Sequence, residues 1–290
     1  MKNNILFSTI LLYLCFISCS NLSSSYDDIS PKQQEAITII QTYPKPVTEE
    51  SVILGQYGKY RKYLDSSDYL IGISSSRASQ FDAPIIKAYA GFSDYRVETK
   101  SGFPLADHIK LNGTPFPSPF NTKSSSACSE SVFGKSISIS IPKKSTKASS
   151  SEDINIELYA PKEIEILSPK IEDNANLLPL LYYDGLVIEW NEDTMNENGV
   201  VFILEWAGEV VVGQESPETA IRRTCVVKDN GATTLDSHLF DGIPDTAVCH
   251  LTILRGDIDL EDIDGESYKV LVESHEFLSF ILIREIRNKS

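Results

Sequence analysis

The chain has 290 residues, of which 41% are hydrophobic, and a formal net charge of −15 at pH 7. That length suits one large domain or two small ones, and the hydrophobic content is sufficient for a real core. The charge is uneven, because residues 21–151 hold 15 basic and 12 acidic side chains while residues 152–290 hold 10 and 29. An acidic second half repels phosphates and argues against nucleic acid as a partner.

The first eighteen residues have the pattern of an export signal. Lys2 supplies a positive charge, and residues 5–17 form an apolar run that is broken only by Ser8 and Thr9. A membrane-spanning helix needs about 20 apolar residues, so we do not expect a transmembrane anchor. Residues 1–18 are therefore predicted to be a signal peptide.

The apolar run ends in Phe16, Ile17, Ser18 and Cys19. This stretch resembles the lipobox of bacterial lipoproteins, in which a small residue precedes a cysteine that is acylated and becomes the new N-terminus. Cys15 does not fit, because Tyr13 and Leu14 before it are bulky. The resemblance implies lipidation at Cys19, which anchors the protein stably because three acyl chains are buried. Ser20 in the second position is compatible with sorting to an outer membrane; the alternative is an ordinary cleaved signal.

The N-terminal part after the signal falls into two segments. Residues 19–30 are rich in serine and lack apolar periodicity, so they are predicted to form a flexible tether between the lipid and the folded protein. Ser30 and Pro31 then have the pattern of a helix start, and Pro44 ends the following apolar run. We expect a short helix there, within a smaller β-rich N-terminal region over residues 31–142.

Tyrosines cluster among basic residues in the next stretch, at Tyr57, Tyr60 and Tyr63. Tyrosines three residues apart can form a stacking surface for sugars or for an anionic ligand. The favoured interpretation is a helical turn that packs these rings on the domain. The three tyrosines are nevertheless the first candidates for a ligand-stacking site.

Strand patterns dominate from residue 84 onward. Asn112 and Gly113 form a strong tight-turn signal within residues 108–116, and Ile137, Ile139 and Ile141 alternate with serines. The Lys- and Ser-rich residues 143–153 are the best candidate for a linker, because the charge balance also changes there.

Residues 154–290 hold a series of short apolar stretches separated by turn signals such as Asp184-Gly185 and Asn198-Gly199. The predicted strands are 154–159, 163–167, 185–190, 200–206, 222–227, 247–254, 268–273 and 278–285. This pattern indicates a β-sandwich. The segment resembles an immunoglobulin-like or fibronectin type III-like sandwich, which makes the predicted fold class mainly β.

Two cysteines are expected on inward faces of that sandwich. Cys225 shares a strand face with Val227, and Cys249 shares one with Leu251 and Ile253. A Cys225–Cys249 bridge is plausible for an exported protein. It would contribute roughly 3 kcal/mol in the loop-entropy model.

No catalytic motif is convincing, and no cofactor or metal is predicted. Glu189 and Glu205 would lie about 13 Å apart in a hairpin, further than glycosidase carboxylates. The acidic residues 257–266 lack the glycine and glutamate of a calcium loop and are predicted to form a solvated hairpin turn.

The sequence predicts a non-enzymatic, lipid-anchored envelope protein, held in the outer membrane. The lipobox and the Ser/Asp-rich tether look like those of Bacteroidota lipoproteins, many of which act in surface glycan capture, so glycan binding is the leading hypothesis. The alternative is an adhesin or a structural subunit of a cell-surface assembly, with another envelope protein as its partner.

Overall fold

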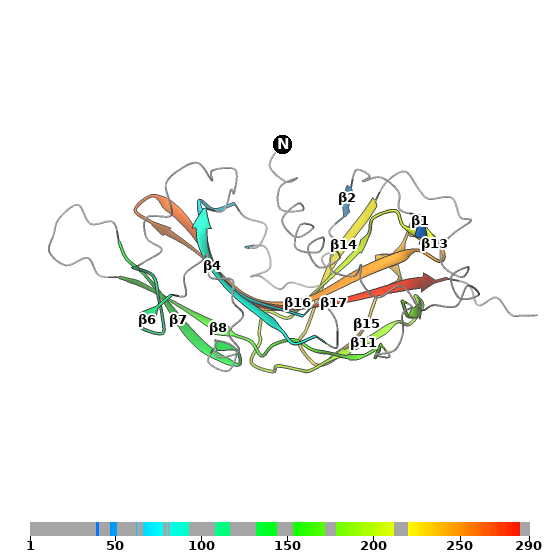
Figure 1. The fold of residues 1–290 in the computed structure, drawn as a ribbon, viewed down its shortest axis with the longest axis horizontal. Coiled ribbons are helices and arrows are strands. Elements are labelled where there is room, and N and C mark those ends of the chain that lie inside the picture. The colour runs from blue at the N-terminus through cyan, green and yellow to red at the C-terminus, as the bar shows by residue number, and fades with distance from the viewer. Residues whose placement is uncertain are drawn as a thin grey trace, which may run out of the picture.

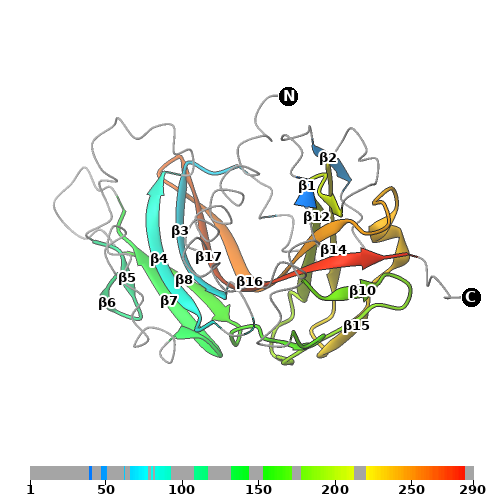
Figure 2. The same ribbon diagram turned by 45° about the vertical axis from the view of Figure 1, so that its right-hand side comes forward.

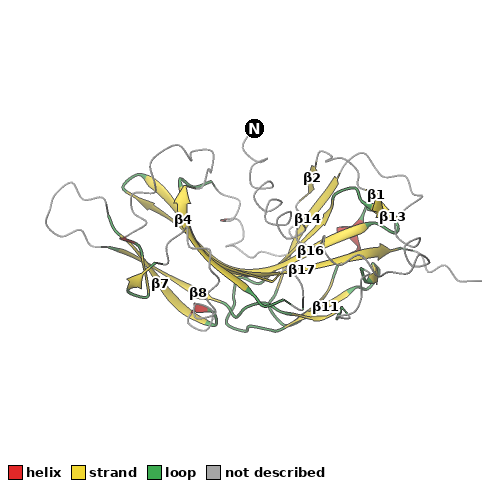
Figure 3. Ribbon diagram, viewed as in Figure 1, coloured by secondary structure: helices red, strands yellow, loops and turns green. Residues whose placement is uncertain are grey.

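The computed structural model describes residues 39–40, 47–50, 62, 66–77, 80, 82–92, 108–116, 132–143, 153–171, 178–211 and 220–284. These residues are mainly in β-strands, which confirms the predicted fold class (Figure 3). A short 3-10 helix, η3 (Ser237–Phe240), follows β15. Within the described ranges, no helix is long and apolar enough to cross a membrane.

One large sheet, here called the long sheet, organises the molecule. Its strands lie in the order β2-β14-β12-β16-β17-β3-β4, and β10 pairs with β17 beyond this path. The bounds are β2 (Val47–Glu50), β3 (Tyr69–Arg77), β4 (Ile85–Phe92), β10 (Leu180–Tyr182), β12 (Val200–Trp206), β14 (Ala220–Val227), β16 (Val248–Ile263) and β17 (Glu266–Ile283).

Two smaller sheets complete the second layer. The four-stranded sheet has the order β6-β5-β7-β8, and the three-stranded sheet has the order β15-β11-β9. Their strands are β5 (Lys110–Leu111), β6 (Thr114–Pro115), β7 (Lys135–Ile141), β8 (Ile154–Ala160), β9 (Ile166–Ser168), β11 (Val187–Trp190) and β15 (Ala232–Thr234). A separate antiparallel pair joins β1 (Ile39–Ile40) to β13 (Val210–Val211).

The predicted Asn-Gly turn joins β5 to β6. Asn112 and Gly113 have φ values of 49° and 77°, the left-handed conformation that a two-residue hairpin loop requires. The predicted tight turn at Asn112 and Gly113 is therefore confirmed.

The β16–β17 hairpin runs through the whole molecule, as the orange and red strands of Figures 1 and 2 show. Its sixteen antiparallel residue pairs extend without interruption from Val248–Ile281 to Ile263–Glu266. Because side chains alternate along a strand, one continuous face of this hairpin contributes to two separate cores.

Each core lies between the long sheet and one smaller sheet. In the first lobe, Val270 and Val272 of β17 pack with β3, β4, β7 and β8. In the second lobe, Leu278 and Phe280 of the same strand pack with β9, β11, β12, β14 and η3. Trp190 and Trp206 belong to this second core, each 1% exposed.

Strand pairing connects the parts of the chain before and after the predicted linker. Most of residues 143–153 lie outside the described residues, but β7 before them pairs with β8 after them. In addition, β3 pairs in parallel with β17 over nine residues, so the N-terminal region and the C-terminal strands share one sheet. The two lobes therefore do not divide the chain into an earlier and a later half.

Most predictions for the N-terminal part fall on residues that the structure does not describe. The signal peptide, the tether and Cys19 lie outside the described residues. The predicted short helix also lies outside them, except that Ile39–Ile40 form strand β1. The extended conformation of these two residues is explained by their pairing with β13.

Candidate functional site

Polar side chains replace apolar ones where the hairpin passes from one core to the other. On its core-facing side, Arg255, Asp257, Ser274 and Glu276 are 0%, 4%, 2% and 0% exposed. We call this region the waist. Its position follows from alternation, because Arg255 comes two residues after the buried Ile253 and so has the same orientation.

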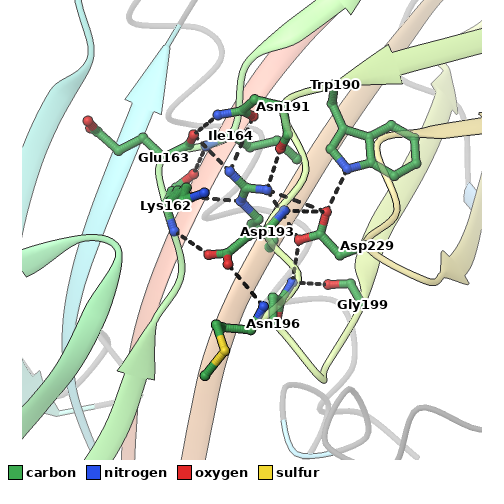
Figure 4. Close-up of polar contacts among 12 residues, drawn as sticks. Lys162, Glu163, Ile164, Trp190, Asn191, Asp193, Asn196, Gly199 and Asp229 are labelled. Carbon is green, nitrogen blue, oxygen red and sulfur yellow. Dashed lines mark hydrogen bonds and ion pairs between the residues drawn. The ribbon is translucent and has the colours of Figure 1, made fainter.

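Arg255 binds the backbone of a segment that leaves one small sheet and enters the other. This crossing segment (residues 159–166) connects β8 to β9. The guanidinium donates from Nε to the carbonyl of Lys162 at 2.6 Å and from one terminal nitrogen to the carbonyl of Glu163 at 2.9 Å. It also donates to the carbonyl of Asn191 at 2.7 Å (Figure 4).

Asp229 forms a buried ion pair with Arg255. Arg255 Nη1 lies 3.2 Å from Asp229 Oδ2, and the side chains of Asp229 and Arg255 are 1% and 0% exposed. The carboxylate also accepts hydrogen bonds from Trp190 Nε1 at 2.8 Å and Asn196 Nδ2 at 2.9 Å. Burial lowers the pKa of Arg255, an effect that the charge of Asp229 opposes. Such a pair persists because both charges are also hydrogen-bonded.

Asp193 holds the other side of the waist. It accepts hydrogen bonds from the backbone nitrogen of Lys162 at 2.9 Å and from the hydroxyl of Tyr159 at 3.0 Å. Burial alone would raise the pKa of Asp193, but these bonds and a third from the nitrogen of Met195 lower it. Burial raises the pKa of Tyr159 to about 12, and the carboxylate acts in the same direction.

Strand β17 secures the far end of the crossing segment. Ile164 donates its backbone N–H to Ser274 Oγ at 2.5 Å, and Ile166 donates to Glu276 Oε2 at 2.8 Å. Burial raises the pKa of Glu276, whose Oε1 has no hydrogen-bond partner in the described part of the chain. The side chains of β17 thus accept the backbone hydrogen bonds that the carbonyl groups of a neighbouring strand would otherwise accept.

The waist is therefore a clamp. Its side chains bind backbone groups of the crossing segment, which lies between the two cores, so a shift of one lobe against the other breaks several buried hydrogen bonds at once. Across the described ranges, no group of three or more His, Cys, Asp or Glu residues is arranged to hold a metal ion.

A second polar group lies on the opposite face of the long sheet, in the second lobe. Arg222, Glu205, His250 and Ser279 are directly opposite one another on β14, β12, β16 and β17. Arg222 Nε lies 3.3 Å from Glu205 Oε1, and His250 Nδ1 lies 2.8 Å from Ser279 Oγ. We call these four residues the polar row. Unlike the waist, it includes an exposed side chain, His250.

The predicted site residues lie in different places. Tyr57, Tyr60 and Tyr63 lie outside the described residues, so the stacking surface remains a prediction. Cys225 and Cys249 are buried as predicted, at 2% and 0% exposure, but both are free thiols.

The predicted Cys225–Cys249 bridge is not formed because strand β12 lies between the two strands. Cys225 pairs with Phe202, which pairs with Ile253, four residues beyond Cys249. The Cα atoms of Cys225 and Cys249 are therefore separated by two strand spacings, about 10 Å across the sheet, and by four residues, about 13 Å along the strands. A disulfide needs about 4.4–6.8 Å. Burial instead raises the pKa of each thiol to about 12.

The two glutamates considered as a carboxylate pair lie in different sheets. Glu189 is on β11, which pairs with β9 and β15, whereas Glu205 is on β12 in the long sheet. The hairpin assumed in working out the distance between the two carboxylates is therefore not formed. The acidic residues 257–266 also differ from the prediction, because all but the Asp264-Gly265 turn belong to β16 and β17.

Sequence reasoning missed the waist, although one signal pointed to it. In the β16 sequence, Cys249, Leu251, Ile253 and Arg255 share one face, so the pattern that predicts the core also directs an arginine inward. No comparable signal marked Asp229, which lies in the turn-like sequence Asp229-Asn230-Gly231. Asp229 is part of the waist because it pairs with Arg255, which is 26 residues away in the sequence.

Comparison with known proteins gives no relative. The chain matches no protein-family model, no curated protein and no solved structure.

Proposed function

We propose that the chain is a bacterial lipoprotein of the cell envelope, anchored through Cys19 and acting as a binding module rather than an enzyme. The observation that carries this proposal is the sequence Phe16-Ile17-Ser18-Cys19 directly after a short apolar run. The anchor is expected in the outer membrane, and the lipid provides the attachment.

The fold supports a binding role. A sheet continuous through two lobes and clamped at the waist keeps its surfaces in fixed relative positions, as a preorganised binding protein requires. Glycan is the proposed ligand class, because the lipobox and tether resemble those of Bacteroidota lipoproteins that act in glycan capture.

Metabolic labelling with a palmitate analogue tests the anchor. We expect the wild type and Cys15→Ala to incorporate label and Cys19→Ala to lose it, since of the two cysteines beside the apolar run only Cys19 follows a small residue. Cys15→Ala is the matched control, because it removes a cysteine four residues away. Protease shaving of intact cells then reports the exposed side of the membrane. Label that survives in Cys19→Ala would refute the proposal.

A second candidate function, a subunit of a surface assembly, is favoured by the edge of the long sheet. Among the described strands, β4 is the last in the order, and it pairs with β3 over eight regular positions. Its sequence, IIKAYAGF, contains one charge and no proline. Such an edge is able to add a strand from a partner. Cross-linking in intact envelopes discriminates, because a subunit gives one dominant partner and a glycan-binding module gives few protein partners.

A further inference from the structure

The polar row has an exposed apolar border on the same face of the sheet. Strand β10 lies beside β17, and Leu180 pairs with Ile281, two residues from Ser279. Leu181 packs on the second core, so Leu180 and Tyr182 have the opposite orientation, toward the face of the polar row. These two side chains are 65% and 39% exposed.

The row and its border form one continuous surface in the second lobe. The four strands of the row and β10 are hydrogen-bonded neighbours, which Figure 2 shows from the side. Adjacent strands lie about 4.8 Å apart and two residues span about 6.6 Å, so the Cα atoms of Leu180 and Ser279 lie about 8 Å apart. A small polar ligand is therefore able to contact the row and the border together.

The charges of the row indicate what kind of ligand it accepts. Arg222 and Glu205 form an ion pair, so their charges cancel. Glu205 would repel an anion bound on the row, and Arg222 would repel a cation. A neutral ligand is repelled by neither side chain. The chain's net charge of −15 further disfavours an anionic polysaccharide.

The hydrogen-bonding groups fit a polyol. A serine hydroxyl both donates and accepts, and an imidazole has a second ring nitrogen free of the bond that its first nitrogen makes. Sugar hydroxyls have the same dual capacity, while the C–H faces of a sugar ring match apolar side chains such as Leu180 and the ring of Tyr182.

We infer that the polar row and its border, Leu180 and Tyr182, are a binding site for a neutral glycan. This inference rests on the proposed glycan-binding function and assigns it a place in the fold. His250 and Ser279 contact sugar hydroxyls, Tyr182 packs on a ring face, and the Arg222–Glu205 pair completes the row.

A neutral and anionic glycan array probed with the full-length protein tests the inference, followed by titration calorimetry with the best neutral ligand. We expect His250→Ala, Ser279→Ala and Tyr182→Ala each to weaken binding about tenfold, the scale of removing one contact residue. Glu189→Gln is the control, because it changes an exposed carboxylate on β11 outside the long sheet. Thermal unfolding of each variant verifies that the fold is retained.

The outcomes separate the inference from the function on which it rests. If the wild type binds no glycan, the proposed glycan-binding function is wrong. If it binds but the row variants bind equally well, the site assignment alone is wrong. If glycan binding is lost only when Tyr57, Tyr60 and Tyr63 are changed to alanine, the site lies in the N-terminal region instead. Preference for anionic glycans would contradict the charge argument.

Discussion

Replacing Arg255 by methionine tests whether the waist holds the two lobes together. The substitution keeps a long side chain but removes the charge next to Asp229, whose side chain is 1% exposed. Removing one member of a buried ion pair costs about 3–5 kcal/mol, because the other charge stays buried without compensation. Against a typical total stability of about 5–15 kcal/mol, that is a large fraction.

Urea unfolding followed by tryptophan fluorescence measures this loss. Trp190 donates directly to Asp229, so its emission reports on the waist itself. With a slope of roughly 3 kcal/mol per molar urea, the expected loss moves the midpoint by about 1 M or more. Lys110→Met is the control, since Lys110 and Asp153 form an exposed pair with 47% and 31% of their side chains accessible. Such a pair contributes about 0–1 kcal/mol.

A double-mutant cycle sharpens the test. If the charges of Arg255 and Asp229 depend on each other, the variant carrying both Arg255→Met and Asp229→Asn loses less stability than the two single changes added together, by about 1–3 kcal/mol. The clamp hypothesis would be refuted if Arg255→Met cost no more than Lys110→Met. Strict additivity would show that the ion pair itself is unimportant.

Three further outcomes are expected. Peptide mapping should find Cys225 and Cys249 unalkylated in the native protein at pH 8 and reactive after unfolding, since burial raises the pKa of both thiols to about 12. A peptide pair linked by a disulfide between them would contradict this. Gly199→Ala should destabilise more than Gly113→Ala in thermal unfolding, because both have φ of 77° but only at Gly199 would the added Cβ collide with a backbone carbonyl. The stabilising effect of Asp193 relative to Asp193→Asn should be full at pH 7 and shrink as the pH falls below 3.8, since the folded pKa is lowered; a pH-independent difference would refute it.

Local patterns predicted some strands well, where the apolar residues form a regular run or alternate with polar ones. The β12 bounds match the prediction at both ends, and β7 follows from its isoleucine alternation. Asn112 and Gly113 located a hairpin because the turn itself demands those residues. In each case the deciding interactions lie within a few residues of sequence.

The long hairpin was missed because its middle looks like a loop. Asp257, Asp259 and Glu261 suggest solvent, but Asp257 is buried and accepts the backbone N–H of Tyr159 at 2.9 Å. Its partner is 98 residues away in the sequence. The strand is thus stabilised by distant contacts that no local pattern encodes, and the same holds for the parallel pairing of β3 with β17.

The path of β16 and β17 also determines when the protein can fold. Asp68, just before β3, is bonded to Ser267 across 199 positions of sequence, and both lobes need residues 248–283 for their central strands. Neither lobe can complete its core until residues 248–283 are present, so the two lobes fold together once the hairpin is available. Contacts of such long range make folding slow. Until then the unpaired strand edges of both lobes are exposed to aggregation, and a truncation before residue 248 removes the central strands of both lobes.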